Sequence, residues 1–140
     1  MVSFIVQAAE NFCAHQIRLP YTVKSLLPKK RTLIAYLDIE TKNGEKYRVY
    51  IGCDAILIQC ISEIFLGEEL SDMETLKDML LETTNMIVGS AKILSEEQQA
   101  SSFTLSTPYF SEYDYFTMNT DGYQTLYVAN GEMTIAIKAL

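Results

Sequence analysis

Hydrophobic positions follow a helical spacing and then a strand spacing in the first third of the chain. Apolar residues three and four apart predict a helix over residues 3–17, with Ser3 as its expected N-cap. Alternating or β-prone patterns then predict three strands, over residues 21–26, 31–40 and 47–52. The turn signal Asn43-Gly44 joins the last two into a hairpin. This part of the chain therefore predicts the order α-βββ.

Two further helices are predicted next. Asp54 is an expected N-cap for a helix over residues 55–66, which Gly67 is expected to end. Ser71 and Glu74 have the Ser-x-x-Glu spacing of a capping box, which predicts the start of a second helix that runs to about Leu94.

The last part of the chain is again rich in β-branched and aromatic residues. Four strands are predicted, over residues 102–106, 113–119, 123–128 and 133–138, with turn signals at residues 119–122 and at Asn130-Gly131. The order helix, strands, Asn-Gly hairpin thus occurs twice, and 130 − 43 = 87 positions separate the two asparagines. We interpret the chain as a degenerate duplication with an extra helix between its halves.

This organisation defines a fold class. One α-βββ unit cannot bury both a helix and a sheet face, so the two units are expected to share one sheet. The prediction is an α+β fold in which duplicated α-βββ units share a mostly antiparallel sheet, with long helices packed on one side. A chain of 140 residues suits a single domain over residues 1–140.

Composition narrows the functional classes. The chain has 18 acidic and 11 basic residues, a net charge of −7, so nucleic acid is not an expected partner. With one histidine, His15, chemistry that needs several imidazoles is excluded. The three cysteines lie in apolar stretches and are expected to be reduced thiols, and a nucleophilic pair of Cys13 and His15 is disfavoured because their side chains point apart on a helix. No signal peptide or membrane-spanning segment is recognised, so we expect a cytoplasmic protein without a membrane partner.

The second long helix carries a narrow polar stripe. Asp78, Glu82 and Asn85 fall within roughly 60° of one another on the helix, and Gly89 lies on the same side. A solvated face would explain such a stripe on amphipathicity alone. Against that interpretation, asparagine and glycine are poor residues for a helix interior, and two carboxylates four residues apart repel each other. These features favour a stripe that is kept for function.

Asp78-x-x-x-Glu82-x-x-Asn85 resembles the signature of the CheC/CheX/FliY chemotaxis phosphatases, in which a proline follows a little over twenty residues later, as Pro108 does here. The corresponding part of the first helix has Gln7 and Glu10 where the family has Glu and Asn. Only one motif is intact, so the chain most resembles the single-motif CheX type.

The resemblance implies a hydrolase that removes the aspartyl phosphate of a CheY-type response regulator in two-component signalling. Asn85 would hold the attacking water, because a carboxamide donates and accepts hydrogen bonds without charge. Glu82 would pair with the lysine at the regulator's phosphorylation site, and Asp78 would support that contact. Gly89 would let the regulator approach closely. The protein would need no cofactor or metal of its own, since the Mg²⁺ would belong to the regulator.

Several alternatives stay open at this point. The flagellar switch proteins resemble the same duplicated fold without the motif, so a non-catalytic chemotaxis or switch adaptor is the alternative to an enzyme. The resemblance also implies a homodimer joined at sheet edges, for which the C-terminal strands are the first choice. The tyrosines of that block are expected to pack across strands rather than to stack on bases, and the methionines at positions 73, 79 and 86 are expected to fill the core.

Overall fold

The computed structural model describes residues 2–98 and 102–140. Its helices are α1 (Val2–Asn11), which continues into the π-helical turn η1 (Phe12–Gln16), α2 (Ala55–Leu66) and α3 (Met73–Glu97). Its strands are β1 (Tyr21–Lys24), β2 (Thr32–Thr41), β3 (Lys46–Cys53), β4 (Phe103–Leu105), β5 (Tyr109–Asp114), β6 (Gly122–Val128) and β7 (Gly131–Ala139).

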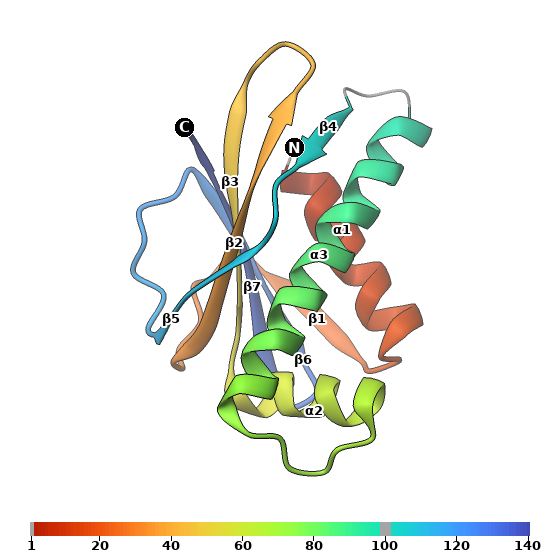
Figure 1. Cartoon of the computed structure of the whole chain (residues 1–140), viewed down its shortest axis with the longest axis vertical. Coiled ribbons are helices and arrows are strands. Elements are labelled where there is room, and N and C mark those ends of the chain that lie inside the picture. Colours follow the sequence, from red (N-terminus) through yellow and green to blue (C-terminus); the bar gives the residue numbers. More distant parts are fainter. Residues whose placement is uncertain (1, 99–101) are drawn as a thin grey trace.

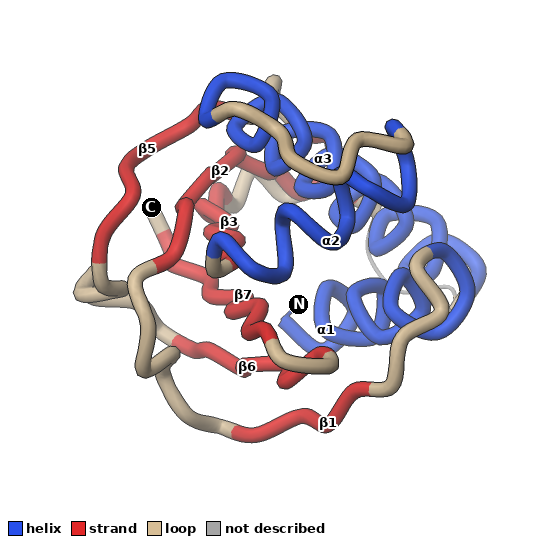
Figure 2. The backbone as a smooth tube through the Cα atoms, turned by 90° about the horizontal axis from the view of Figure 1, so that it is seen from below, coloured by secondary structure: helices blue, strands red, loops and turns tan. Residues whose placement is uncertain are grey.

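One antiparallel sheet holds all the described strands, in the order β1-β6-β7-β3-β2, with both β4 and β5 paired to the outer side of β2. Exchanging each strand of the first half for its counterpart in the second reverses this order onto itself. The two halves therefore share the sheet as the duplication predicts, and β3 and β7 meet at its centre. Figure 2 shows the sheet curving around the helices, and Figure 1 shows α1 and α3 side by side on its concave face with α2 across one end.

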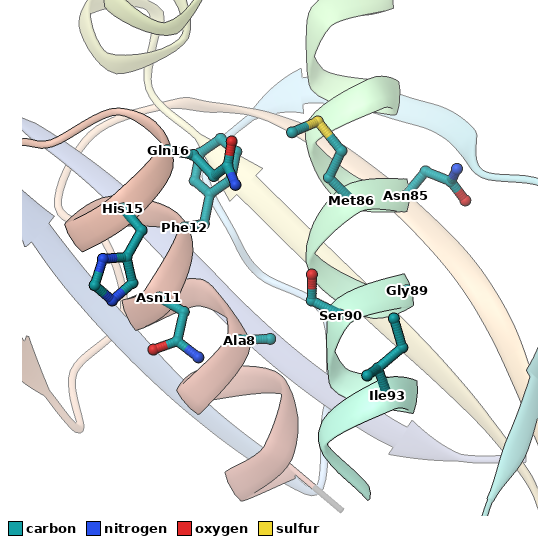
Figure 3. A pocket seen from close by; sticks show the side chains of 10 residues that line it. All are labelled: Ala8, Asn11, Phe12, His15, Gln16, Asn85, Met86, Gly89, Ser90 and Ile93. Carbon is teal, nitrogen blue, oxygen red and sulfur yellow. The ribbon is translucent and has the colours of Figure 1, made fainter. Parts of the chain in front are cut away.

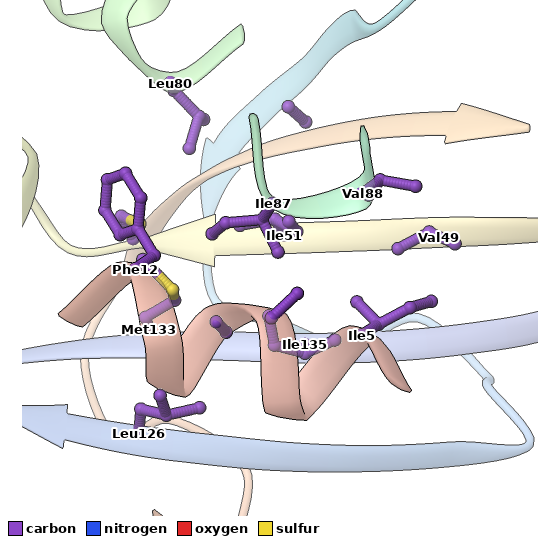
Figure 4. Packing of buried hydrophobic residues seen from close by; sticks show 14 of the residues in the cluster. Ile5, Phe12, Val49, Ile51, Leu80, Ile87, Val88, Leu126, Met133 and Ile135 are labelled. Atoms are coloured by element: carbon purple, nitrogen blue, oxygen red, sulfur yellow. The ribbon is translucent and has the colours of Figure 1, made fainter. Parts of the chain in front are cut away.

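The core lies between this face and the helices, as Figure 4 shows. Alternate residues of the central strands point into it, and they meet the apolar side of α3. Buried residues include Leu33, Ile51, Leu80, Ile87, Met133 and Ile135. Burial of aliphatic side chains of this size stabilises the fold by about 1.5–3 kcal/mol each. The sheet, which the core fixes against α3, determines which side of α3 faces outward.

The predicted helix ends are partly confirmed. The Asp54 side chain accepts a hydrogen bond from the Leu57 N–H at 3.0 Å, and Gly67 ends α2 with a φ of 72°. The N-cap of α3 is Asp72 rather than Ser71, since Asp72 accepts from the Thr75 N–H at 2.8 Å and Ser71 instead bonds with the Ser62 hydroxyl. This hydrogen bond lowers the pKa of Asp72. Ser3 is not an N-cap, because α1 already begins at Val2.

Two expectations about the C-terminal strands, the bounds of one strand and which strands are unpaired, differ from the structure. The segment predicted over residues 113–119 begins earlier, at Tyr109, and ends at Asp114. Phe116 leaves the strand because its ring packs edge-on against Tyr50, at a centroid distance of 6.1 Å, in a small cluster on the face away from the helices. Of the C-terminal strands, β6 and β7 are paired on both sides, so only β4 and β5 lie at an edge of the sheet.

Gly131 has a packing role that the turn signal did not predict. The positive φ of its turn belongs to Ala129, whereas a Cβ on Gly131 would lie 2.5 Å from the Leu57 Cβ and 2.9 Å from Asp54 Oδ1. The missing side chain lets β7 approach the start of α2. It thereby keeps α2 close to the end of the sheet.

We expect Gly131→Ala to lower the free energy of unfolding by about 1–3 kcal/mol, because the methyl group has to displace the first turn of α2. Gly122→Ala is the matched control, since a Cβ there meets nothing within 4 Å. Denaturant unfolding of both variants checks this. Equal stabilities would show that α2 does not depend on the close approach.

Candidate functional site

The outward side of α3 carries the polar stripe. Asp78, Glu82 and Asn85 are exposed, whereas Thr83 and Thr84 between them are fully buried. The Thr84 hydroxyl donates to the Leu80 carbonyl at 2.8 Å. The helix period and the buried threonines thus fix the direction of the stripe. The opposite side of α3 is apolar, with Leu76, Leu80, Ile87 and Ala91 buried.

Asp78, Glu82 and Asn85 have no hydrogen-bond or ion-pair partner among residues 2–98 and 102–140. Their neighbour Lys77 differs, since its ammonium group lies 3.5 Å from Glu74 and 4.9 Å from the centre of the Phe110 ring. Two like charges four residues apart destabilise an exposed helix by a few tenths of a kcal/mol. Within the described chain, the stripe therefore makes no contact that stabilises α3.

Pro108 lies beside the stripe although 23 positions separate it from Asn85. Together with Leu81 it lines a shallow hollow of about 320 Å³ that Asp78, Glu82 and Asn85 complete. The segment that carries Pro108 is held between β4 and β5, and Ser106 exchanges two hydrogen bonds with the Asp38 backbone, both 2.8 Å long. The sheet edge thus positions one wall of the hollow and α3 the other.

The face of α3 toward α1 has a second hollow of about 520 Å³. Figure 3 shows Phe12 and Gln16 on one side and Met86, Ser90 and Ile93 on the other, with the Asn85 carboxamide pointing away from α1. Gly89 lines this hollow, and a Cβ on it would meet nothing within 4 Å. Nothing in the described structure therefore requires a glycine at this position.

The first helix carries the counterpart of the stripe in altered form. Glu10 stands where the family motif has asparagine, and it lies close to Tyr21. Desolvation and then the Glu10 carboxylate raise the pKa of Tyr21. The first helix thus carries an acid where the motif of α3 has the amide.

The cysteine and histidine arrangement is as expected. Cys13 is buried and His15 is exposed, so they do not pair, and burial together with the Glu10 charge raises the pKa of the Cys13 thiol to about 12. Cys53 is fully buried and its pKa is also raised. These two thiols are inert near neutral pH.

The described residues include neither a metal-binding cluster nor a membrane-spanning helix. No group of three or more His, Cys, Asp and Glu side chains is placed to hold a metal ion there. Over the same ranges, no helix combines the length and the apolar character needed to cross a membrane.

The model of the chemotaxis phosphatase CheX family matches residues 38–130. The chain belongs to this family. A CheC-like protein of Shewanella oneidensis is 20% identical, with a TM-score of 0.81 over 99% of this chain and 97% of that one. CheX of Vibrio vulnificus is 19% identical, with a TM-score of 0.84 over 99% and 95%. A comparison with curated protein sequences finds no significant match.

A third solved structure is a complex of CheX with CheY, BeF3 and Mg²⁺ from Borrelia burgdorferi. The chain matched in that complex is 15% identical in sequence to this chain, with a TM-score of 0.67 over 98% of this chain and 97% of that one. At these identities the structures establish the fold that this CheX-family chain shares with them. They are consistent with the duplicated α+β architecture that the sequence predicts.

Sequence reasoning missed one part of the surface. Met79 is buried as predicted, but Met73 is exposed and Met86 lies between two hollows on the surface of α3. Among the tyrosines, Tyr109 packs across strands as predicted, on its register partner Tyr36 at a centroid distance of 5.8 Å, although it stays half exposed. A single apolar residue on a helix does not indicate whether a neighbouring helix covers it.

Proposed function

We propose that this CheX-family chain hydrolyses the aspartyl phosphate of a CheY-type response regulator and so ends a chemotaxis signal, with residues 1–140 acting as one phosphatase domain. The observation that carries the proposal is the stripe of Asp78, Glu82 and Asn85, which is exposed, has no partner in the described chain and borders an open hollow with Pro108. Such side chains are available to a second protein.

Asn85 is proposed as the catalytic residue. Its carboxamide accepts a hydrogen bond from a water molecule and can donate one to a phosphoryl oxygen, and it carries no charge that would repel the phosphoryl group. The water oxygen forms a bond to phosphorus while the bond from phosphorus to the aspartyl oxygen breaks, and the electron pair stays on the aspartate carboxylate. Inorganic phosphate and the unmodified regulator are the products. Positioning and charge stabilisation dominate catalysis in such transfers.

Glu82 is proposed to dock the regulator. Its carboxylate, one helical turn before Asn85, would pair with the lysine beside the phosphorylated aspartate, and this charge-assisted contact would set the register between the two proteins. Asp78, a further turn back, would add to the same negative surface. The Mg²⁺ that assists the transfer is proposed to come with the regulator. A homodimer joined at a sheet edge remains a proposal as well.

The rate at which a phosphorylated CheY-type regulator loses phosphate, with and without this chain, tests the proposal. Faster loss in its presence is expected. Binding without any acceleration would instead indicate the non-catalytic adaptor of the same fold.

Gly89 gives a prediction in which stability and binding move in opposite directions. Gly89→Ala should raise the free energy of unfolding by about 1 kcal/mol, because alanine is the better helix former and its Cβ meets nothing in the described chain. The same methyl group should weaken binding of the regulator if the regulator packs against the helix there. Thermal unfolding and a binding titration check the two effects, and unchanged affinity would remove Gly89 from the proposed contact surface.

A further inference from the structure

An apolar groove runs beside the stripe, between α2 and α3. It has a volume of about 390 Å³ and is formed by Phe65 and Leu66 at the end of α2 and by Met79 and Met86 of α3. Asp78 and Glu82 also line it, on the side of the stripe. The groove therefore has an apolar wall and an acidic border.

The groove is part of a larger surface. Phe65 stacks on Phe12 of the π-helical turn, with ring centroids 6.1 Å apart and an interplanar angle of 25°. Met86 lines both this groove and the hollow between α1 and α3, where Figure 3 shows its side chain at the gap between the helices. The groove and the hollow between α1 and α3 thus adjoin at Met86.

Several of these apolar residues are open to solvent. Leu66 is 53% exposed, and Phe65 is also exposed although its ring stacks on Phe12. Asp54 anchors the start of α2, where it caps the helix, pairs with Lys30 at 3.3 Å and accepts from the Glu132 N–H at 3.3 Å. Further along α2, Gln59 and Ser62 form hydrogen bonds with the connection to α3. The last turn of α2, which carries the groove, presents apolar side chains outward.

We propose that this groove is the second contact site for the response regulator, and that it takes up a bulky apolar side chain from the segment of the regulator that bears or adjoins its active-site lysine. The proposal rests on the proposed function for the identity of the partner. Continuity carries it: Asp78 and Glu82 belong to both the stripe and the groove, so a protein that docks on the stripe also covers the groove. A lysine beside an apolar side chain matches the two unpaired carboxylates beside an apolar wall.

The area and the apolar anchors that a specific interface needs also support the regulator as the occupant of the groove. Stable interfaces bury about 800 Å² on each side, and their affinity is concentrated in a few apolar anchors in desolvated pockets. A stripe of three polar side chains offers charge pairing but no such anchor. Methionine, which is flexible and polarisable, suits a surface that adapts to an inserted side chain.

The test compares Leu66→Gln with Ile56→Gln. Both residues lie on α2 and have similar exposure, 53% and 56%, but Ile56 does not line the groove. Glutamine keeps helix propensity and adds no charge that would act on the helix dipole. The readout is the dissociation constant for a CheY-type regulator activated with BeF3⁻ and Mg²⁺, which needs no hydrolysis and therefore tests the groove separately from the phosphatase activity.

We expect Leu66→Gln to raise this dissociation constant about tenfold or more, and to raise KM in phosphate release by a similar factor with little change in kcat. Ile56→Gln should behave as the parent protein. Met86→Ala provides a second groove variant, and thermal unfolding of all three verifies folding.

Two results would overturn the groove as a docking site for the regulator. One is parental affinity in both groove variants. The other is that the groove variants sediment differently from the parent protein in the absence of the regulator, while their affinity for the regulator is unchanged. That result would show that a second copy of the chain occupies the groove. A third result separates the two proposals. If the groove variants weaken binding of the regulator but the parent protein does not accelerate phosphate release, the groove is supported as a docking site and the phosphatase proposal fails.

Discussion

Asn85→Ala should lower the rate at which this chain dephosphorylates its regulator by about 10²-fold or more, the usual effect of removing a group that positions or stabilises the reacting atoms. The side chain is exposed and has no partner in the described chain, so the fold should be unaffected. Affinity for the regulator should stay close to that of the parent protein. The loss should therefore appear in kcat rather than in KM.

Asn11→Ala is the matched control for this experiment. Asn11 is also an exposed asparagine, at the end of α1, and Figure 3 shows it on the far side of the hollow from α3. The same chemical change there should leave kcat as it is. Full activity in Asn85→Ala would remove Asn85 from the mechanism.

Glu82→Lys should weaken binding of the regulator about 10²-fold or more, because it sets two ammonium groups against each other where a carboxylate and a lysine are proposed to pair. Glu97→Lys makes the same change of charge on the same helix, outside the stripe, and should change the affinity for the regulator little. A titration with the BeF3⁻-activated regulator measures both.

Glu82→Gln separates charge from shape in this contact. It keeps a hydrogen-bond acceptor and removes the charge, so its affinity should lie between that of the parent protein and that of Glu82→Lys. If Glu82→Lys bound as tightly as the parent, the proposed lysine contact would be wrong.

The sequence predicts those parts of the fold that depend on local patterns. Helical periodicity places Asp78, Glu82 and Asn85 on one side of α3, and the structure puts all three on the exposed side. The Asn43-Gly44 signal marks a hairpin in which Gly44 has a φ of 84°. In both cases a few neighbouring residues determine the outcome, and distant contacts do not override it.

Features that depend on distant segments are not visible in the pattern. Pro108 adjoins the stripe only because β4 and β5 both pair with β2, which brings the connection between them next to α3. Gly131 carries a turn signal, yet its role is the close approach to Leu57. Met86 and Leu66 line the same groove only because the end of α2 lies next to α3. Each of these depends on tertiary packing, which residue spacing does not encode.

The central claim is that this chain is a catalyst that uses the Asn85 amide. Its most direct test is phosphate release from a continuously phosphorylated CheY-type regulator in the presence of a small fraction of this chain per regulator molecule. We expect many turnovers per molecule of the parent protein and almost none for Asn85→Ala. Release no faster than that of the regulator alone, from a parent protein that binds the regulator, would contradict it.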